Sequence, residues 1–221
     1  MPSPKIQVLE RAFYARSPRR VARELLGKVL VRQTPKGRLT GRIVEVEAYL
    51  GEKDLAAHAA AGKTLRNAVL FGPPGYAYVY FIYGNHYCLN VSCEREGRAG
   101  GVLFRALEPL TGIEEMARAR GIEIEKPRDL PLLTNGPGKL AQAFGITRTR
   151  DNGCDLTNAA GSLWIGEDDY RARHIEVTPR IGISKDTEHL LRFIVAESAF
   201  VSGRRTLQAR KRERDSGHRR T

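Results

Sequence analysis

Two carboxylates and an aromatic ring lie within five residues in the segment Glu45-Val-Glu-Ala-Tyr49. Alternate side chains of a β-strand point to the same face, so Glu45, Glu47 and Tyr49 would share one face. Same-face neighbours are roughly 6.5 Å apart, close enough for Glu47 and Tyr49 to line one pocket. The pattern fits a catalytic carboxylate beside a ring, or the solvated acidic face of an edge strand. The strand alone favours the edge strand.

A second segment with candidate functional side chains is the tyrosine-dense run at residues 76–83, which contains Tyr76, Tyr78, Tyr80 and Tyr83. Gly84-Asn85 separates this run from a second alternating run, residues 86–93. Gly-Asn between two such runs predicts a tight hairpin, with positive φ at both turn positions. Tyr83 would then be the last strand residue before the tip. Its ring could be a wedge between stacked bases or could lie flat on a neighbouring loop, which is the commoner arrangement.

Arg105 interrupts an otherwise apolar run at residues 102–107. An arginine inside a buried strand needs an acidic partner to offset its desolvation. Glu45 or Glu47 could supply that carboxylate. The pattern fits a functional pair and a purely structural ion pair equally well.

The sequence does not indicate a metal site. Its three cysteines form no CxxC pair, and no histidine spacing is typical of zinc. A divalent-metal nuclease site built from Glu45, Glu47 and His58 is a poor match to a two-metal clamp, because it offers two carboxylates and a distant histidine.

Two glycine-rich segments could contact phosphates. Residues 51–75 form a long loop-like stretch that contains Lys63, Arg66 and Asn67, and loops of this length in a compact domain are usually functional. Residues 135–145 predict a glycine turn that enters a short helix, where Lys139 could hold a DNA phosphate. Neither segment has the pattern of a P-loop or a dinucleotide-binding loop.

The segments that hold these residues are mostly short strands. A cap serine, a proline and a closing glycine predict a helix at 17–27, and a capping-box pattern from Thr111 to Glu114 predicts another that ends at Gly121. We expect strands at 28–33, paired with the Glu47 strand, and at 101–107, 162–166, 174–178 and 191–196. Strands outnumber long helices, so the sequence predicts an α+β domain on a curved, mainly antiparallel sheet.

Composition points to a polyanionic partner. The chain has 221 residues, enough for one domain, with a formal net charge of +12. Residues 204–221 contain eight Lys or Arg and two acids, so this tail carries +6 of the charge. We expect residues 1–203 to form the domain and 204–221 to be a basic, disordered tail. The N-terminus lacks a signal-peptide pattern, and no 18-residue apolar segment occurs, which favours a cytoplasmic protein.

Ten ordered blocks cover most of the chain, from about Leu9 to Ser202. The blocks are Arg42-Ile-Val-Glu-Val-Glu-Ala-Tyr-Leu-Gly51, Ala57-His58, Gly62-Lys-Thr-Leu-Arg-Asn67, Phe71-Gly-Pro-Pro-Gly75, Tyr78-Val-Tyr-Phe-Ile-Tyr-Gly84, Cys88-Leu-Asn-Val91, Val102-Leu-Phe-Arg-Ala-Leu-Glu-Pro109, Asn135-Gly-Pro-Gly-Lys-Leu140, Arg180-Ile-Gly182 and Arg192-Phe-Ile-Val195. Together they resemble the alkyladenine (3-methyladenine, methylpurine) DNA glycosylase family. The resemblance implies a single α+β domain with an open barrel-like sheet, similar to the formyltransferase C-terminal domain, surrounded by short helices.

The same resemblance implies roles for individual residues. Glu47 would be the general base, and Arg105 with the backbone carbonyl of Ile181 would hold the attacking water. The base pocket would comprise Tyr49, His58 and Tyr80, which sandwich the base, and Asn90, which discourages guanine. Tyr83 would enter the minor groove and fill the gap left by a flipped nucleotide, and the candidate backbone contacts are Thr64, Arg66, Asn67 and Lys139.

The implied activity is that of a monofunctional DNA glycosylase. It would release damaged purines of the 3-methyladenine, 7-methylguanine, hypoxanthine and ethenoadenine class from double-stranded DNA, leave an abasic site, need no cofactor and act as a monomer. No lysine falls within the matched active-site positions. Removal of Met1 would expose the amine of Pro2, which could form a Schiff base in a lyase, but Pro2 lies outside the matched region. The chain departs from the family pattern at Leu65, at residues 59–61 and at Asn85. A catalytically silent nucleic-acid-binding domain is the alternative.

Overall fold

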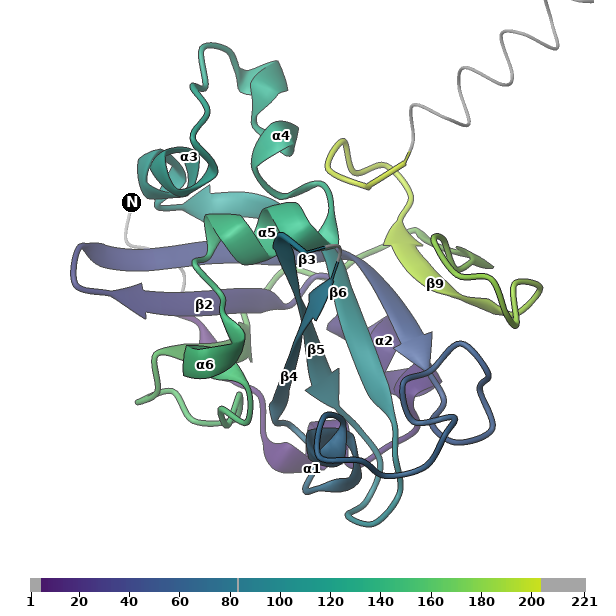
Figure 1. The fold of residues 1–221 in the computed structure, drawn as a ribbon. Coiled ribbons are helices and arrows are strands. Elements are labelled where there is room, and N and C mark those ends of the chain that lie inside the picture. The colour runs from purple at the N-terminus through teal and green to yellow at the C-terminus, as the bar shows by residue number, and fades with distance from the viewer. Residues whose placement is uncertain (1–4, 83, 204–221) are drawn as a thin grey trace, which may run out of the picture.

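The strand that carries both glutamates is the centre of the sheet. The computed structural model describes residues 5–82 and 84–203 (Figure 1). β3 (Gly37–Tyr49) pairs with β2 (Val29–Thr34), with β6 (Gly101–Thr111) and with β9 (Leu190–Val195). Glu45 and Glu47 are both fully buried. The expectation of a solvated edge strand is therefore wrong.

The remaining strands extend this centre into one antiparallel sheet. The described residues form nine strands, and the main path runs β1-β7-β2-β3-β6-β5-β4, with β9 pairing β3 and β8 pairing β9. Register shifts interrupt the pairing of β3 with β6, and such bulges bend a strand. The sheet curls into a half-barrel, so the α+β prediction is confirmed. The other strands are β1 (Gln7–Val8), β4 (Ala77–Ile82), β5 (His86–Ser92), β7 (Leu163–Glu167) and β8 (Ile175–Pro179).

Short helices cover the sheet from two sides. In Figure 1, α2 (Pro18–Leu25) lies behind the sheet and α5 (Pro137–Ala143) lies in front of it. α2 begins at a proline, as its sequence predicts, and it buries Val21, Ala22 and Leu25. The others are α1 (Arg11–Tyr14), α3 (Ile113–Arg120), α4 (Pro131–Thr134) and α6 (Arg148–Asp151), with 3-10 turns η1 (Ala68–Phe71) and η2 (Pro127–Asp129). None of the described helices is long and apolar enough to cross a membrane.

The capping box predicted for α3 is absent. Gly112 occupies the N-cap position in a left-handed conformation and offers no side chain. The Thr111 hydroxyl instead donates to the backbone oxygen of Arg38, because Thr111 still belongs to β6 beside the β2–β3 hairpin. Gly121 ends the helix at a positive φ of 62°, as predicted.

The β4–β5 hairpin has a longer loop than its sequence predicts. Ile82 pairs with His86, so residues 83–85 form the connection. Gly84 has a φ of 72°, but Asn85 is not among the residues with positive φ. The expectation of positive φ at both positions is therefore wrong, because a three-residue loop needs one left-handed residue. Tyr83 lies outside the described residues, as does the tail at 204–221.

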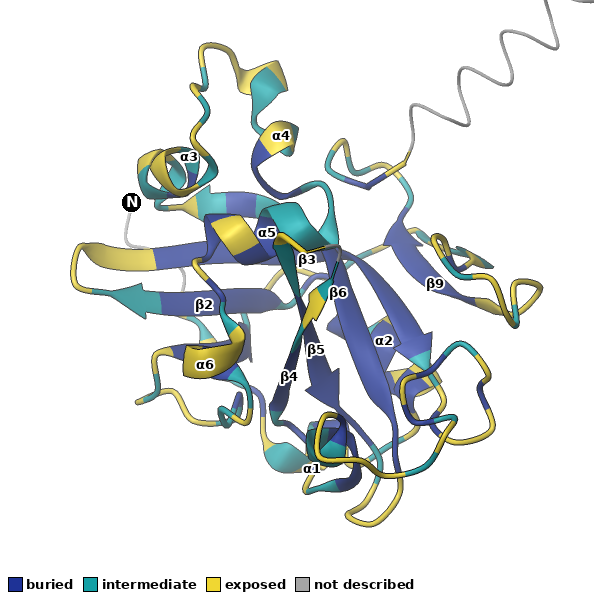
Figure 2. Cartoon of the chain, in the orientation of Figure 1, coloured by how far each residue is buried: buried dark blue, intermediate teal, exposed yellow. Residues whose placement is uncertain are grey.

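The core is continuous through the sheet. Figure 2 shows buried residues along β3, β5 and β6. Val44, Val46 and Ala48 belong to the main hydrophobic cluster, which also includes residues of α2. Because the acidic face of β3 is buried as well, its charges need partners inside the protein.

Candidate active site

Arg105 joins the two glutamates of β3. Its Nη1 lies 3.3 Å from Glu47 Oε1, and its Nε donates to Glu45 Oε1 at 3.0 Å. Arg105 therefore has both of the carboxylate partners that the sequence offered. Burial alone would lower the pKa of Arg105, but Glu47 and Glu45 outweigh burial and raise it. The guanidinium is a permanent cation beside both carboxylates.

Two further donors hold the Glu47 carboxylate. The Tyr49 hydroxyl donates to Oε2 at 3.0 Å, and the backbone N–H of Ile181 donates to Oε1 at 2.9 Å. Burial, followed by the charge of Glu47, raises the pKa of Tyr49, so this hydroxyl keeps its proton. In this structure Ile181 meets Glu47 through its N–H, whereas the resemblance implied its carbonyl.

A pocket of about 420 Å³, lined by aromatic side chains, lies next to Tyr49. Tyr49, His58, Tyr80 and Asn90 all line it, so the structure brings together the residues predicted to hold a base. The His58 and Tyr80 rings are 4.4 Å apart between centroids and meet edge to face at 72°. Glu47 is not among the lining residues, but Tyr49, which donates to it, and Gly182, which follows Ile181, both line the pocket.

Tyr78 is a pocket residue that was not among the predicted site residues. Its hydroxyl lies 2.9 Å from His58 Nδ1, and the ring lines the pocket beside Tyr80. Strand alternation placed Tyr78 and Tyr80 on one face, so the signal was present in the sequence. Desolvation and the nearby charge of Arg66 lower the pKa of His58, which favours the neutral imidazole. Asn90 is 6% exposed and donates to the backbone oxygen of Tyr78 at 3.2 Å.

A buried ion pair that sequence reasoning missed fixes the pocket wall. Arg180 donates to both oxygens of Asp54, at 2.6 and 2.9 Å, and to the backbone oxygen of Ala48 at 3.1 Å. Its guanidinium also lies 4.7 Å from the centroid of the Tyr49 ring. Residues 54 and 180 are 126 positions apart and follow no local period, so no sequence pattern could reveal the pair.

The candidate phosphate contacts have different surroundings. Asn67 is 2% exposed, and its amide donates to the backbone oxygens of His58 and Gly62 while its oxygen accepts from the Thr64 N–H. Asn67 thus holds the loop together from inside. Thr64 and Arg66 are exposed on that loop. Lys139, on α5, donates to the side chain of Asn135 at 2.8 Å.

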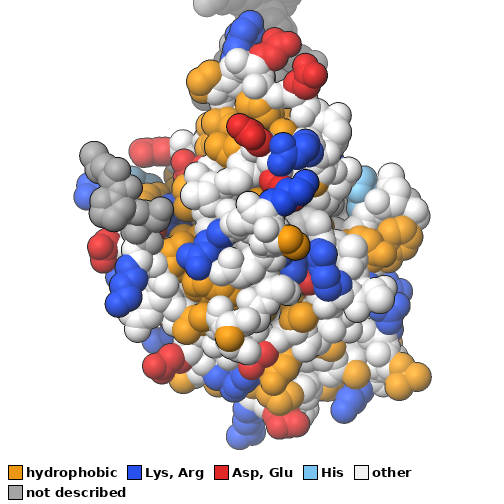
Figure 3. All heavy atoms as spheres, turned by 90° about the vertical axis from the view of Figure 1, so that its left-hand side faces the viewer, with side chains coloured by type: hydrophobic (Ala, Val, Ile, Leu, Met, Phe, Trp, Pro, Cys, Tyr) orange, Lys and Arg blue, Asp and Glu red, His pale blue; other side chains and the backbone are white. Residues whose placement is uncertain are grey.

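Positive charge is spread over the surface. Figure 3 shows Lys and Arg side chains distributed over one face of the molecule, with acidic side chains among them.

In the described part of the chain, no three His, Cys, Asp or Glu side chains are grouped so that they could hold a metal ion.

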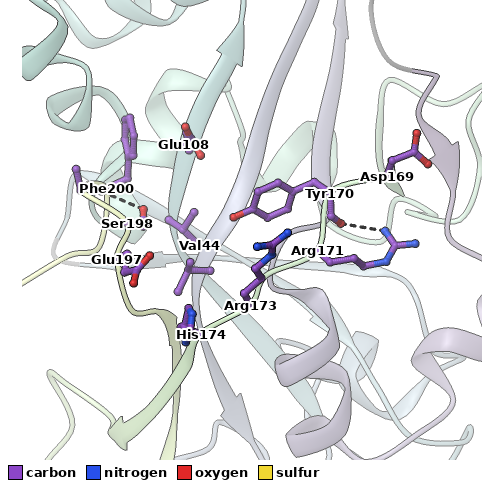
Figure 4. Close-up of a pocket in the computed structure, with 12 residues that line it drawn as sticks. Val44, Glu108, Asp169, Tyr170, Arg171, Arg173, His174, Glu197, Ser198 and Phe200 are labelled. Atoms are coloured by element: carbon purple, nitrogen blue, oxygen red, sulfur yellow. Dashed lines mark hydrogen bonds between the residues drawn. The ribbon is translucent and has the colours of Figure 1, made fainter.

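A larger cavity, of about 810 Å³, lies elsewhere on the protein (Figure 4). Its charges are mixed, because acidic and basic groups line the same opening. The acidic lining residues are Glu108, Asp169 and Glu197, and the basic ones are Arg171, Arg173 and His174. Among the described residues, no predicted site residue lines this cavity. The aromatic pocket is therefore the candidate active site.

Comparison with known proteins shows the family of this chain. The sequence model of the family described as Methylpurine-DNA glycosylase (MPG) matches residues 12–199. The chain belongs to the methylpurine-DNA glycosylase family. The match includes Glu47, Arg105 and every described residue that lines the aromatic pocket.

Individual members of the methylpurine-DNA glycosylase family are similar over nearly their whole length. A protein of Koribacter versatilis is 60% identical over 199 residues, which cover 90% of this chain and 95% of that protein. One from Methanocella arvoryzae is 49% identical, with coverage of 84% and 89%. One from Alkaliphilus oremlandii is 44% identical, with coverage of 88% and 98%. All three carry 3-methyladenine DNA glycosylase as a provisional name.

Proposed function

We propose that this protein removes damaged purines from double-stranded DNA by hydrolysing the N-glycosidic bond, which leaves an abasic site. One observation carries the proposal: Tyr49, which lines the aromatic pocket, donates to Glu47 of the buried Glu47–Arg105 pair. The names of the relatives support 3-methyladenine as one substrate. The proposed wider set is 7-methylguanine, hypoxanthine and ethenoadenine.

The pocket suits a flat, electron-poor ring. A damaged purine between Tyr49, His58 and Tyr80 would contact aromatic side chains, and stacking of a cationic alkylated purine on such rings gains about 0.5–2 kcal/mol. Neutral lesions lack that gain, so they must be selected by contacts to their edges. Asn90, held by its bond to the Tyr78 backbone, is the group that would crowd the exocyclic amine of guanine.

The base must leave the duplex before it can enter this pocket. Extrusion of a nucleotide costs a few kcal/mol, least for damaged or mispaired bases. Tyr83 is proposed to offset part of this cost by filling the gap. It follows Ile82 in the sequence, and Ile82 lines the pocket. Arg66 and Thr64 on the exposed loop are the proposed backbone contacts, together with Lys139.

Bond cleavage places positive charge on the sugar, and a carboxylate nearby stabilises it. In the proposed step the oxygen of a water bonds to C1′, its proton passes to Glu47, and the electrons of the C1′–N bond leave with the base. Because Glu47 is fully buried, one wall must move to admit the water. Ile181 is the candidate, since it is 37% exposed and covers the carboxylate through its backbone N–H.

The proposed enzyme is monofunctional. A glycosylase with lyase activity uses an amine that forms a Schiff base with C1′. Lys185 lines the outer part of the pocket, although it lies outside the matched active-site positions. Borohydride treatment during turnover tests this point. We expect no trapped protein–DNA adduct, and an adduct that disappears in Lys185→Ala would overturn the assignment.

The decisive experiment is a base-release assay on duplexes that carry different purine lesions. We expect the wild type to release free base, and Glu47→Gln to lose about 10²–10⁴-fold in rate while it still binds DNA. Glu24→Gln, a change of an exposed carboxylate on α2, is the matched control. A wild type that binds lesion DNA but releases no base would favour a silent binding domain. A rate abolished by EDTA would favour a metal nuclease.

A further inference from the structure

Glu45, the second carboxylate of β3, has no part in the reaction proposed above, yet it is among the most heavily hydrogen-bonded side chains of the described protein. It is fully buried. Its Oε1 accepts from Arg105 Nε at 3.0 Å, from Arg192 Nε at 2.7 Å and from the Ser202 hydroxyl at 2.8 Å. Its Oε2 accepts from the Ser202 backbone N–H at 2.6 Å.

These contacts come from three directions and fix the carboxylate in space. Arg105 belongs to β6, Arg192 to β9, and Ser202 to the C-terminal segment. Arg192 also donates to the Ser202 backbone oxygen at 2.9 Å and to the Thr178 hydroxyl at 3.2 Å. Every partner of Glu45 is a donor, as an ionised carboxylate requires. Arg192 supplies a second cation, so Glu45 does not consume the whole charge of Arg105.

We propose that Glu45 is a positioning residue for base excision: it anchors the Nε edge of Arg105 so that Nη1 of the same guanidinium faces Glu47. The inference rests on the proposed function, in which Glu47 is the base. A guanidinium is planar and rigid, so fixing one edge fixes the direction of the other. Arg192 and Ser202 hold Glu45 in turn. The C-terminal segment thereby becomes part of the support for the active site.

The charge of Glu45 also affects Glu47 through the arginine they share. The titratable and charged groups that face Glu47 are Tyr49 from its own strand, Cys88 from β5, Arg105 from β6 and Arg180 from the segment after β8. Of these, only Arg105 also contacts Glu45. If Glu45 is replaced by a neutral residue, Arg105 keeps Glu47 as its one carboxylate partner, so the pH dependence of the reaction should change.

The test separates the effect of the charge of Glu45 from the effect of its side-chain length. In Glu45→Gln, kcat for hypoxanthine release should fall about tenfold or more, and the acid limb of its pH profile should move to lower pH. In Glu45→Asp the charge remains but the chain is one carbon shorter, so kcat should fall while the acid limb stays in place. Asp168→Asn, which breaks the ion pair with Arg42 away from the pocket, should change neither kcat nor the limb.

A structural role alone would leave the acid limb in place in every variant that folds. An unmoved limb in folded Glu45→Gln therefore overturns the inference. If Glu45→Gln does not fold, Ser202→Ala decides, because it removes one hydrogen bond and keeps both ion pairs. Its kcat should fall about two- to fivefold while its melting temperature falls by only about 1–6 °C, and an unchanged kcat would overturn the inference. A wild type without base release would instead refute the proposed function.

Discussion

Replacement of Asp54 by asparagine should destabilise the whole protein and not only the pocket. The side chains of Asp54 and Arg180 are 1% and 0% exposed, and their atoms approach to 2.6 Å. Removal of one partner from a buried ion pair leaves an uncompensated charge and costs about 3–5 kcal/mol. For a chain of this size, each kcal/mol lowers the melting temperature by about 2–4 °C. We therefore expect a drop of about 6–20 °C in thermal unfolding.

The control for this change is a carboxylate that is also paired but exposed. Glu24 pairs with Arg16 and Arg20, and its side chain is 41% exposed. Such surface pairs contribute about 0–1 kcal/mol, so Glu24→Gln should lower the melting temperature by no more than about 4 °C. Equal melting temperatures for Asp54→Asn and Glu24→Gln would refute the reasoning.

The stability effect should depend on pH with a definite sign. Burial alone would raise the pKa of Asp54, but hydrogen bonds from Arg180, Leu50 and Ala56 outweigh it and lower the pKa. A lowered folded-state pKa contributes stability above the unfolded value of about 3.9 and loses it as the pH falls through the folded value. The gap in melting temperature between wild type and Asp54→Asn should therefore persist from neutral pH to about pH 4 and narrow below it.

Further predictions concern the pocket loop and its histidine. Gly51 has a φ of 87°, and an added Cβ would lie 2.2 Å from the Ala99 oxygen, whereas Gly62 has a φ of 83° and open space. In urea unfolding, Gly62→Ala should cost about 1–2 kcal/mol, and Gly51→Ala at least about 1 kcal/mol more. Tyr78→Phe removes the hydroxyl beside His58 Nδ1 and should lower kcat/KM for base release about three- to tenfold.

Alternation and turn residues predicted most of the sheet but not its boundaries or its centre. β4, β5, β7, β8 and β9 lie where the sequence placed strands. β1 and α6 were not predicted, because each is too short to show a period. β1 pairs with β7 through two residues, and the Thr147 hydroxyl accepts from the Arg150 N–H at the start of α6. The alternation of β3 alone favours an edge strand, because the arginines that bury its acidic face come from distant segments.

The sequence likewise predicted only some of the contacts in the candidate site. A lone arginine in an apolar run was enough to pair Arg105 with a glutamate of β3, because an unpaired buried charge is costly. No comparable pattern in the sequence indicates the residues that hold Glu45 in place. Ser202 reaches Glu45 across 157 positions. The contact between Ile181 and Glu47 depends on the orientation of one peptide, next to a glycine at positive φ, and the order of residues does not specify that orientation.

The buried charges around the pocket are balanced, and this balance bears on lesion choice. Three carboxylates and three guanidinium groups surround the wall behind Tyr49: Glu45, Glu47, Asp54, Arg105, Arg180 and Arg192. Well-packed apolar residues would often give equal or greater stability, so stability alone does not account for this set. The six formal charges cancel, so the net charge of +12 is carried elsewhere. In the proposed function we therefore expect the aromatic faces and Asn90 to discriminate between lesions, and the basic groups elsewhere to attract DNA.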